Sequence, residues 1–223
     1  MDLTNREGSD AAERESSASY EGMWVAMNGP AVGEAITFGH YPQRGADAGP
    51  EPVEWIVLDV DRNAATLISK CALDAMPYSG GEPIVSWESC TLRNWLNHHF
   101  ADAAFTDDER AMLVSTRVMA GMNPAFPTNP GNDTQDRVYL LSIEEAERFF
   151  RSDRDRICAA TAYAKARGAG TNRMDTCRWW LRSPGIHSDH AAFIMRIGSI
   201  FRRGGSVLNG DLGVRPVIVL SLT

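Results

Sequence analysis

The sequence predicts an α+β fold in which strands near the two ends of the chain enclose a helical middle. Strand-like runs occupy about residues 35–69 and 178–222, and helical patterns lie between about residues 89 and 168. Strands and helices do not alternate regularly, which argues against a doubly wound parallel sheet. We therefore expect short antiparallel strands with two to four helices, and N- and C-terminal strands that pair with each other.

Length and composition predict one folded domain preceded by a tail. The chain has 223 residues, of which 43% are hydrophobic and 23% are charged, an ordinary balance for a globular protein. Residues 1–22 carry six acidic residues against two arginines and few apolar side chains, so we expect a disordered or loosely attached tail and a single domain over residues 23–223.

The same features predict where the protein resides. No apolar run reaches the ~20 residues that a membrane helix needs, so we expect no membrane insertion. The start of the chain lacks the basic and apolar stretches of a secretory signal, which favours the cytoplasm. Display on a phage particle or a cell surface stays open, because a phage-borne or otherwise exported protein can lack such a signal.

The N-terminal strands form a predicted hairpin. A short strand is expected at residues 35–41 and a stronger one at residues 54–60. The polar stretch Asp61-Arg62-Asn63 is typical of a turn, and the β-rich run at residues 64–69 follows it.

The helical middle begins with an amphipathic segment over about residues 89–100. Its apolar face is predicted to carry Leu92, Trp95, Leu96 and His99. We interpret His99 as a partly buried core histidine rather than a ligand, and expect the adjacent His98 to point elsewhere.

Capping boxes predict two further helices. Thr106 with Glu109 opens a helix that we expect to continue to about Ser115. Ser142 with Glu145 opens another, after a strand at residues 137–141. The segment at 121–136 is rich in Pro, Asn, Gly and Thr and is predicted to be a long irregular loop, either functional or disordered. The Ala-rich residues 159–168 are expected to form a short helix.

Strands return after Cys177. We predict a strand at 178–183 that ends at Pro184-Gly185, with one of Trp179 and Trp180 facing the core and the other facing outward or covering an edge. Further short strands are expected at residues 191–201, 206–208 and 214–222.

Charge is distributed unevenly along the chain. The net charge is −7, from 22 basic and 29 acidic residues, which argues against general nucleic-acid binding. Residues 178–223 nevertheless carry six arginines against two aspartates, a local charge of +4. This segment could hold buried structural arginines, or it could present a positive field to an anionic ligand or an acidic partner. We interpret Arg182 and Arg215 as internal arginines paired with carboxylates such as Asp59 or Glu54.

The sequence carries no motif for a cofactor or for covalent catalysis, and we expect no cofactor. P-loop, HExxH, GxSxG and EF-hand patterns are missing, as is a GxGxxG after a strand. The cysteines show no CxxC spacing and are expected to be buried free thiols: Cys71, Cys90, Cys158 and Cys177. The stretch His187-Ser188-Asp189-His190 could ligate a metal, but we interpret it as a polar loop, and four consecutive residues cannot easily form a catalytic triad.

Several segments together resemble an uncharacterised bacterial domain family that ends in a WWLRSPG…GVRP signature. The matching C-terminal segments are residues 179–185, 191–194, 198–200 and 213–217. The matching upstream segments are residues 38–43, 55–58, 92–96 and 161–166. The resemblance covers about residues 34–222.

This family resembles the C-type lectin-like fold, which also houses formylglycine-generating enzymes and the variable proteins of diversity-generating retroelements. In those variable proteins a fixed scaffold displays a diversified C-terminal stretch that binds ligand. The resemblance implies such a face over about residues 186–212. The candidate ligand-binding residues are His187, His190, Phe193, Arg196, Ile197, Ser199, Phe201, Arg202, Arg203, Ser206, Leu208, Asn209, Asp211 and Leu212. The expected scaffold positions are Ala192, Ile194, Gly198, Ile200, Val207, Gly213, Val214 and Pro216.

We therefore expect a non-enzymatic module that binds a protein or other macromolecular ligand, which could be acidic in view of the local positive charge. Two alternatives remain. The first is an oxidase of the formylglycine-generating type, which would require reactive cysteines and a metal. Only Cys177 lies in the relevant region, and no other thiol is near it in the sequence. The second is an accessory structural domain without an exposed site.

Overall fold

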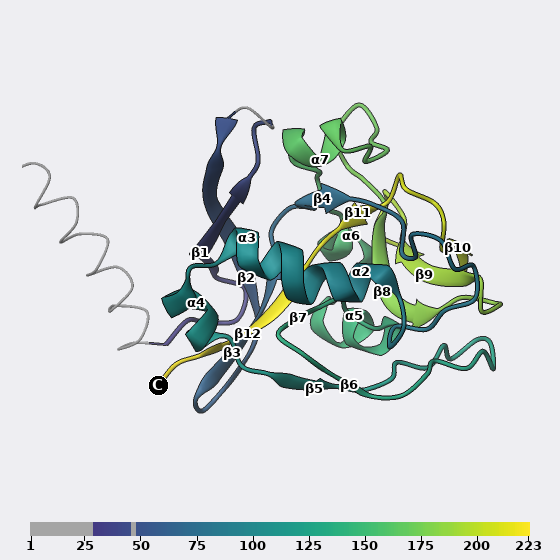
Figure 1. Ribbon diagram of the computed structural model, residues 1–223, viewed down its shortest axis with the longest axis horizontal. Helices are drawn as coiled ribbons and strands as arrows, with labels where there is room; N and C mark the ends of the chain where they lie inside the picture. Colours follow the sequence, from purple (N-terminus) through teal and green to yellow (C-terminus); the bar gives the residue numbers. More distant parts are fainter. Residues whose placement is uncertain (1–28, 46–47) are drawn as a thin grey trace, which may run out of the picture.

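Two five-stranded sheets lie side by side in the protein (Figure 1). The computed structural model describes residues 29–45 and 48–223, so the expected tail at 1–22 and the first residues of the expected domain lie outside it. The first sheet has the order β1 (Ala35–Pro42), β2 (Pro50–Asp61), β3 (Ala64–Ser69), β12 (Val217–Ser221), β7 (Val138–Tyr139). The second has the order β10 (Ile200–Ser206), β9 (His190–Ile194), β8 (Trp179–Pro184), β11 (Gly213–Val214), β4 (Asp74–Ala75). The mixed α+β class is confirmed, but the described residues form six short α-helices rather than the two to four expected, because the helical middle is broken into short segments.

The first sheet contains the predicted hairpin and also the last strand of the chain. β2 and β3 pair antiparallel around the turn at 61–64, as the sequence predicts. β12 is inserted between β3 and β7, where Val217 lies opposite both Ile68 and Tyr139. N- and C-terminal strands therefore share one sheet, although the partner of β12 is β3 rather than β1.

One continuous helical segment runs along the front of both sheets (Figure 1). It consists of α2 (Thr91–Trp95), the π-helical turn η2 (Leu96–Phe100) and α3 (Ala101–Ala104). Leu92 and Leu96 are buried as predicted, but His99 is exposed. The prediction for His99 is wrong because a π turn contains more residues than an α turn and rotates the positions that follow Leu96.

Both predicted capping boxes are present. In α4 (Asp107–Met112) the Thr106 hydroxyl accepts from the Glu109 amide at 3.2 Å, and in α5 (Ile143–Phe149) the Ser142 hydroxyl accepts from the Glu145 amide at 3.1 Å. α4 ends at Met112, short of the expected Ser115.

The remaining helices are α6 (Asp153–Arg156) and α7 (Ala162–Ala166), and the strands β5 (Thr116–Val118) and β6 (Thr134–Asp136) form a separate ribbon.

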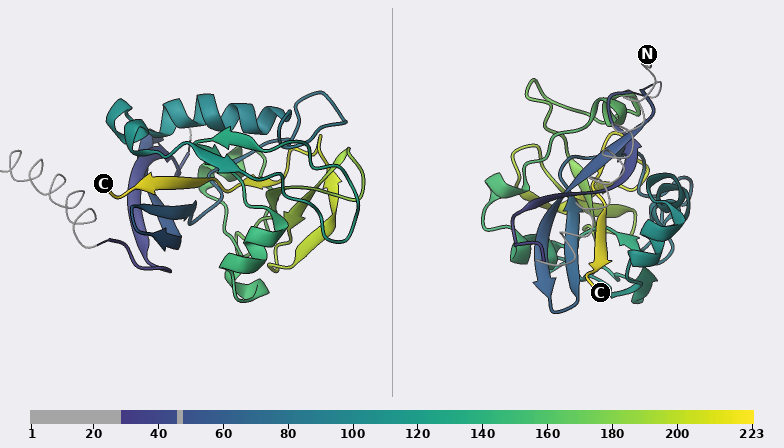
Figure 2. Two further views of the ribbon diagram at one scale, coloured as in Figure 1. Left: turned by 90° about the horizontal axis from the view of Figure 1, so that it is seen from below. Right: turned by 90° about the vertical axis from the view of Figure 1, so that its left-hand side faces the viewer.

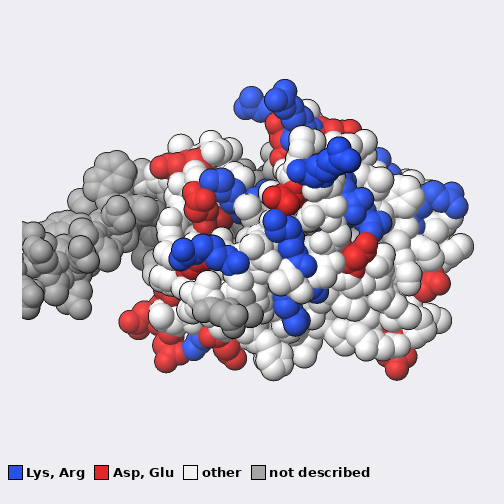
Figure 3. Space-filling model, turned by 90° about the horizontal axis from the view of Figure 1, so that it is seen from above, with Lys and Arg blue, Asp and Glu red and all other residues white. Residues whose placement is uncertain are grey.

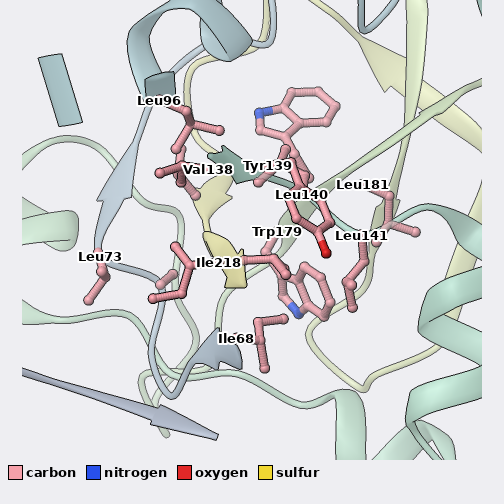
Figure 4. Close-up of a cluster of buried hydrophobic side chains, with 14 of the residues drawn as sticks. Ile68, Leu73, Leu96, Val138, Tyr139, Leu140, Leu141, Trp179, Leu181 and Ile218 are labelled. Carbon is pink, nitrogen blue, oxygen red and sulfur yellow. The ribbon is translucent and has the colours of Figure 1, made fainter. Parts of the chain in front are cut away.

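The core lies between the two sheets. Figure 4 shows Trp179 of β8 beside Ile218 of β12 and Ile68 of β3, with Leu141 close by. Trp179 and Trp180 are both fully buried, so the expectation that one indole would face outward or cover an edge is wrong. β8 is an inner strand whose two faces are covered, and each indole N–H donates to a backbone carbonyl oxygen. The left view of Figure 2 shows the two sheets again, with the helical segment of α2, η2 and α3 along one side of the molecule.

The two internal arginines are buried as predicted but have different partners. Arg182 is 3% exposed and forms an ion pair with Glu145 of α5. Arg215 is 2% exposed and has no ion pair with any described carboxylate. The expected partners Asp59 and Glu54 are directed to exposed cations instead. Their strand β2 lies in the first sheet, away from the guanidinium of Arg182.

The predicted strand at 191–201 is a hairpin. β9 ends at Ile194, β10 begins at Ile200, and the Met195 amide donates to the Ser199 carbonyl oxygen at 2.8 Å across the turn. Gly198 makes the turn with φ of 86°. A Cβ atom there would lie 1.6 Å from the carbonyl oxygen of Asp153, so the turn sits directly against α6. The strand expected at 206–208 is the end of β10 followed by a turn.

Alanine substitutions at two glycines of nearly equal φ separate the energy of this contact with α6 from the cost of backbone strain. Gly33 has φ of 88° and nothing within 4 Å of a built Cβ atom. Gly33→Ala should therefore cost only the left-handed strain of about 1–2 kcal/mol. Gly198→Ala adds the clash with Asp153 and should cost more than ~4 kcal/mol. Urea unfolding of both variants checks this, and equal losses would contradict the docking of the turn on α6.

Candidate ligand-binding surface

β10 forms an edge of the second sheet, and exposed residues among the predicted ligand-binding residues lie on it and in the turns at its two ends. Phe201 is 38% exposed and Arg203 is exposed on the strand. Leu208 is 48% exposed in the turn after β10 and Ile197 is 69% exposed in the turn before it. Large apolar side chains in solvent along one edge are typical of a recognition surface.

Phe201 is the outer member of an aromatic row across the sheet. The row runs through directly opposed positions, Trp180 on β8, Phe193 on β9 and Phe201 on β10. The ring centroids of Phe193 and Phe201 are 5.1 Å apart, and those of Trp180 and Phe193 are 6.2 Å apart. Phe193 is only 4% exposed, so its predicted exposure is wrong. Its ring packs against the ring of Phe201 on the neighbouring strand and is not exposed to a ligand.

A bulge in β10 receives the long loop that the sequence predicts at 121–136. Pairing with β9 shifts register between Phe201 and Gly205, and Gly204 has φ of 74°. The side-chain amide of Asn123, which is 3% exposed, donates to the carbonyl oxygens of Pro184 at 2.8 Å and Arg202 at 2.7 Å. The loop is thereby fastened to the strand end and to the bulge at the same point.

Four loops meet beside β10 and form what we call the loop platform, residues 79–89, 119–132, 185–190 and 206–209. Backbone hydrogen bonds join them: the Val85 amide donates to the Ser188 carbonyl oxygen at 3.2 Å, and the Val207 amide to that of Asp189 at 2.9 Å. The Thr128 hydroxyl donates to the Ile186 carbonyl oxygen at 3.0 Å. The platform is therefore a built surface rather than a set of independent loops.

The loop platform encloses a shallow depression of about 680 Å³. Its lining combines apolar and polar groups: Pro83, Ile84, Pro127, Thr128, Asn129, Ile186, His187, Ser188 and Asp189. A second depression of about 310 Å³ adjoins it and shares Ile84, Asn129 and Ser188. The side chain of Ile84 is 75% exposed at the rim, which offers an apolar contact to an incoming ligand.

The charge in the larger depression comes from Asp189. The Nδ1 atom of His190 lies 2.6 Å from its carboxylate, and this hydrogen bond, with the neighbouring His190 and His187 rings, lowers the pKa of Asp189 below its ordinary value. Over the described ranges 29–45 and 48–223, no three His, Cys, Asp or Glu side chains gather closely enough to hold a metal ion. What the depression offers is hydrogen bonding and apolar contact.

Comparison with known proteins places the chain in a family. Residues 62–222 match the model of a family described as a domain of unknown function, DUF6273. The chain belongs to the DUF6273 family. A search of curated proteins found no match, and a search of solved structures found none either. None of the helices in the described part of the chain is long and apolar enough to cross a membrane.

In this DUF6273 domain the predicted site residues separate into three classes of exposure. The exposed residues are His187, Ile197, Phe201, Arg203, Ser206 and Leu208. The half-buried residues are His190, Arg196, Ser199, Arg202, Asn209 and Asp211. Phe193 and Leu212 are buried, Leu212 completely, so both lie beneath the surface as framework. The predicted scaffold positions are buried except Ile200, which is half-buried.

The predicted site residues also lie in different parts of the domain. His187, His190 and Ser206 lie at the loop platform, because Ser206 pairs with His190 at the end of the hairpin. Ile197 lies at the opposite end of the hairpin, at the turn that packs on α6. Arg196 turns toward the loop before β8, donating to the Gly170 carbonyl oxygen at 3.0 Å.

Three of the six arginines in residues 178–223 form ion pairs within the chain, Arg182 with Glu145 among them. Arg178 pairs with Asp211, and Arg202 pairs with Glu147 of α5. Arg182 and Arg215 are buried. Arg203 instead lies over the ring of Phe126, 5.9 Å from its centroid. On the face seen in Figure 3, basic and acidic side chains lie next to one another over much of the surface.

Sequence reasoning missed the part of the surface that lies outside residues 186–212. Ile84 and Asn129 line both depressions, and Asn123 fastens the loop to β10. The Pro- and Asn-rich composition of 121–136 marked that loop as a candidate, but nothing in the pattern of residues 79–89 distinguishes them from an ordinary connection.

Asn123 should control the order of the loop platform. Asn123→Ala leaves the carbonyl oxygens of Pro184 and Arg202 without this donor, which should cost about 1–3 kcal/mol and accelerate hydrogen exchange of the amides at 121–128. Asn132→Ala is the matched control, because its side chain donates to an exposed carboxylate and its loss should cost less than ~0.5 kcal/mol. Similar exchange rates in the two variants would show that the loop is held by other contacts.

Proposed function

We propose that this protein binds a macromolecular ligand, without covalent chemistry, through the edge strand β10 and the loop platform. The observation that supports the proposal is that buried and exposed residues alternate in the stretch of chain after Gly185. Ala192 and Ile194 are fully buried, whereas Ile197 and Leu208 are 69% and 48% exposed within the same stretch of chain. Apolar and Arg side chains held out by a buried framework are what a non-obligate interface uses.

The rigidity of the framework supports this proposal. β10 is paired with β9, bulged at Gly204, and joined at the bulge to the loop that carries Asn123. A preorganised surface loses little conformational entropy on binding, so a few anchors such as Phe201 and Arg203 can supply affinity. Ligand contact would extend from these anchors to Ile84 across the larger depression.

We further propose that the fold is C-type lectin-like and that the protein is the variable protein of a diversity-generating retroelement. The insertion of β12 into the sheet of the N-terminal strands and the C-terminal hairpin at the surface support this assignment. For the same role we propose display on a phage particle or at the cell surface. The alternative of an accessory domain without an exposed site is disfavoured, because Phe201 and Arg203 are exposed.

The retroelement proposal predicts where the gene varies. Resequencing in independent isolates should find substitutions at the codons of Ile197, Arg203 and Leu208, because these exposed side chains can change without disturbing packing. The buried Ile194 and Leu212 should be constant. A reverse transcriptase gene and a near-copy of the 3′ segment should lie beside the gene. Variation spread evenly over buried and exposed codons, or the lack of both neighbours, contradicts the proposal.

The binding proposal predicts that the surface tolerates and uses diversity. A yeast-displayed library randomised at Arg203 and Leu208 should keep cooperative unfolding and yield binders to a fixed probe such as lysozyme. A matched library at Ile194 and Leu212 should lose folding in most clones, because large-to-small or polar changes in a core cost about 2–5 kcal/mol. An exposed-position library that folds but yields no binders would count against a ligand surface here.

A further inference from the structure

Three of the four cysteines gather around one buried arginine, away from the proposed ligand surface. Cys71 follows β3, Cys158 lies between α6 and α7, and Cys177 precedes β8. Cys158 and Cys177 are 1% and 0% exposed, while Cys71 is half-buried. The charge of Arg215, at the junction of β11 and β12, acts on all three thiols. These side chains come from segments far apart in the sequence.

Cys158 and Cys177 occupy directly opposed positions on two antiparallel segments. Ala159 and Thr176 form an antiparallel bridge, and the Cys177 amide donates to the Cys158 carbonyl oxygen at 2.9 Å. The next pair of residues along these two segments is therefore Cys158 and Cys177. The Cβ atoms of directly opposed residues are about 4.5–5.5 Å apart. The proximity of the two thiols lowers the pKa of Cys158 and raises that of Cys177. A disulfide needs Cβ atoms about 3.5–4.5 Å apart, so the two segments would have to approach each other by about 1 Å to form one.

Arg215 lacks a counter-charge among the described carboxylates. Its Nε donates to the Ser69 carbonyl oxygen at 2.8 Å, and its guanidinium lies 5.0 Å from the ring centroid of Trp179 and 5.5 Å from that of Phe150. One terminal nitrogen is buried without a hydrogen-bond partner. A buried cation without a nearby anion is strongly destabilising, so the thiols are the groups in position to provide negative charge.

The electrostatics single out Cys158 as that anion. Burial alone would raise its pKa, but the hydrogen bond from Cys177, the charge of Arg215 and the backbone of Ala72 outweigh burial and lower the pKa to about 7. The protonated thiol has its own acceptors, the carbonyl oxygens of Ala159 at 3.3 Å and Lys70 at 3.8 Å. Among the groups that favour the ionised form, Cys177 contributes most and the charge of Arg215 comes next.

The other thiols behave differently. The hydrogen bond to Cys158 and burial raise the pKa of Cys177, so it keeps its proton while its partner ionises. Burial raises the pKa of Cys71 despite the charge of Arg215, with Lys70 and Glu54 acting in opposite directions. Cys90 lies elsewhere in the core, and burial raises its pKa to about 12. Cys90 thus serves as an internal control for a buried thiol without an adjacent unpaired cation.

We propose that Cys158 and Cys177 form an oxidative modification site, which a hydroperoxide converts to a reversible disulfide. The Cys158 thiolate attacks the peroxide, forming an S–O bond and breaking the O–O bond, and the leaving alkoxide takes a proton from solvent. The Cys177 sulfur attacks the resulting sulfenic acid, and hydroxide leaves with the Cys177 proton as water. Two thiols become one disulfide while one hydroperoxide is reduced to an alcohol, or to water from hydrogen peroxide.

The full-length wild-type protein tests this directly. After treatment with hydrogen peroxide, alkylation and trypsin digestion without reductant, the fragments 157–165 and 174–178 should appear joined, with a mass two hydrogen atoms below their sum. Dithiothreitol should release them. Cys71→Ser and Cys90→Ser should leave this linkage intact, whereas Cys177→Ser should abolish it. Unchanged thiols, oxidation of Cys158 to sulfinic acid alone, or linkage through fragment 71–93 would overturn the proposal.

The pH dependence separates an activated thiolate from an ordinary thiol and needs no variant. With a pKa of about 7, the rate of disulfide formation should rise about tenfold between about pH 6 and about pH 8 and then level off. An ordinary thiol continues to gain reactivity to higher pH. A rate that still climbs steeply above about pH 8 would overturn the role of Arg215.

Discussion

The buried guanidinium of Arg182 joins the segments on which the ligand surface is built. Its Nη1 donates to the Leu140 carbonyl oxygen at 2.8 Å and its Nε to that of Met119 at 3.2 Å, while the carboxylate of Glu145 balances its charge. The backbone carbonyl oxygen of Arg182 accepts from the Tyr78 hydroxyl at 2.9 Å. The start of two platform loops, the strand β8 and the helix α5 thus converge on one residue. Removing the half-buried Glu145 would leave the buried guanidinium of Arg182 without its counter-charge, which is destabilising.

The carboxylate of Glu145 also caps helix α5, so this one side chain links the start of the helix to Arg182 on β8. Glu145 closes the capping box of α5 by accepting from the Ser142 amide at 2.9 Å, and it also pairs with Arg182. The Ser183 hydroxyl accepts from the Ile143 amide at 3.0 Å beside this pair. The first turn of α5 is therefore fixed from within the helix and from β8. The position of the strand that precedes the proposed surface depends on both.

Features set by neighbouring residues could be predicted from the sequence, and features set by pairing between distant segments could not. The hairpin of β2 and β3 and the capping boxes depend on a few adjacent side chains. The sequence does not predict the burial of Phe193, because this burial depends on the register that places Phe193 opposite Trp180 and Phe201 on the neighbouring strands. The apolar run at 191–201 looks continuous, and only the left-handed φ of Gly198 divides it. The opposition of Cys158 and Cys177 likewise depends on a pairing of segments separated by α7.

The insertion of β12 between β3 and β7 has a consequence for how the chain folds during synthesis. Both neighbours of β12 are translated long before it, so the strand edges at Leu67 and Val138 stay unpaired until Ile218 has been synthesised. Contacts between residues so far apart in the chain are slow to form, and unpaired strand edges attract other chains in the meantime. Nascent chains that stop short of residue 217 should therefore depend on chaperones, and the first sheet should be the last part of the molecule to become protected.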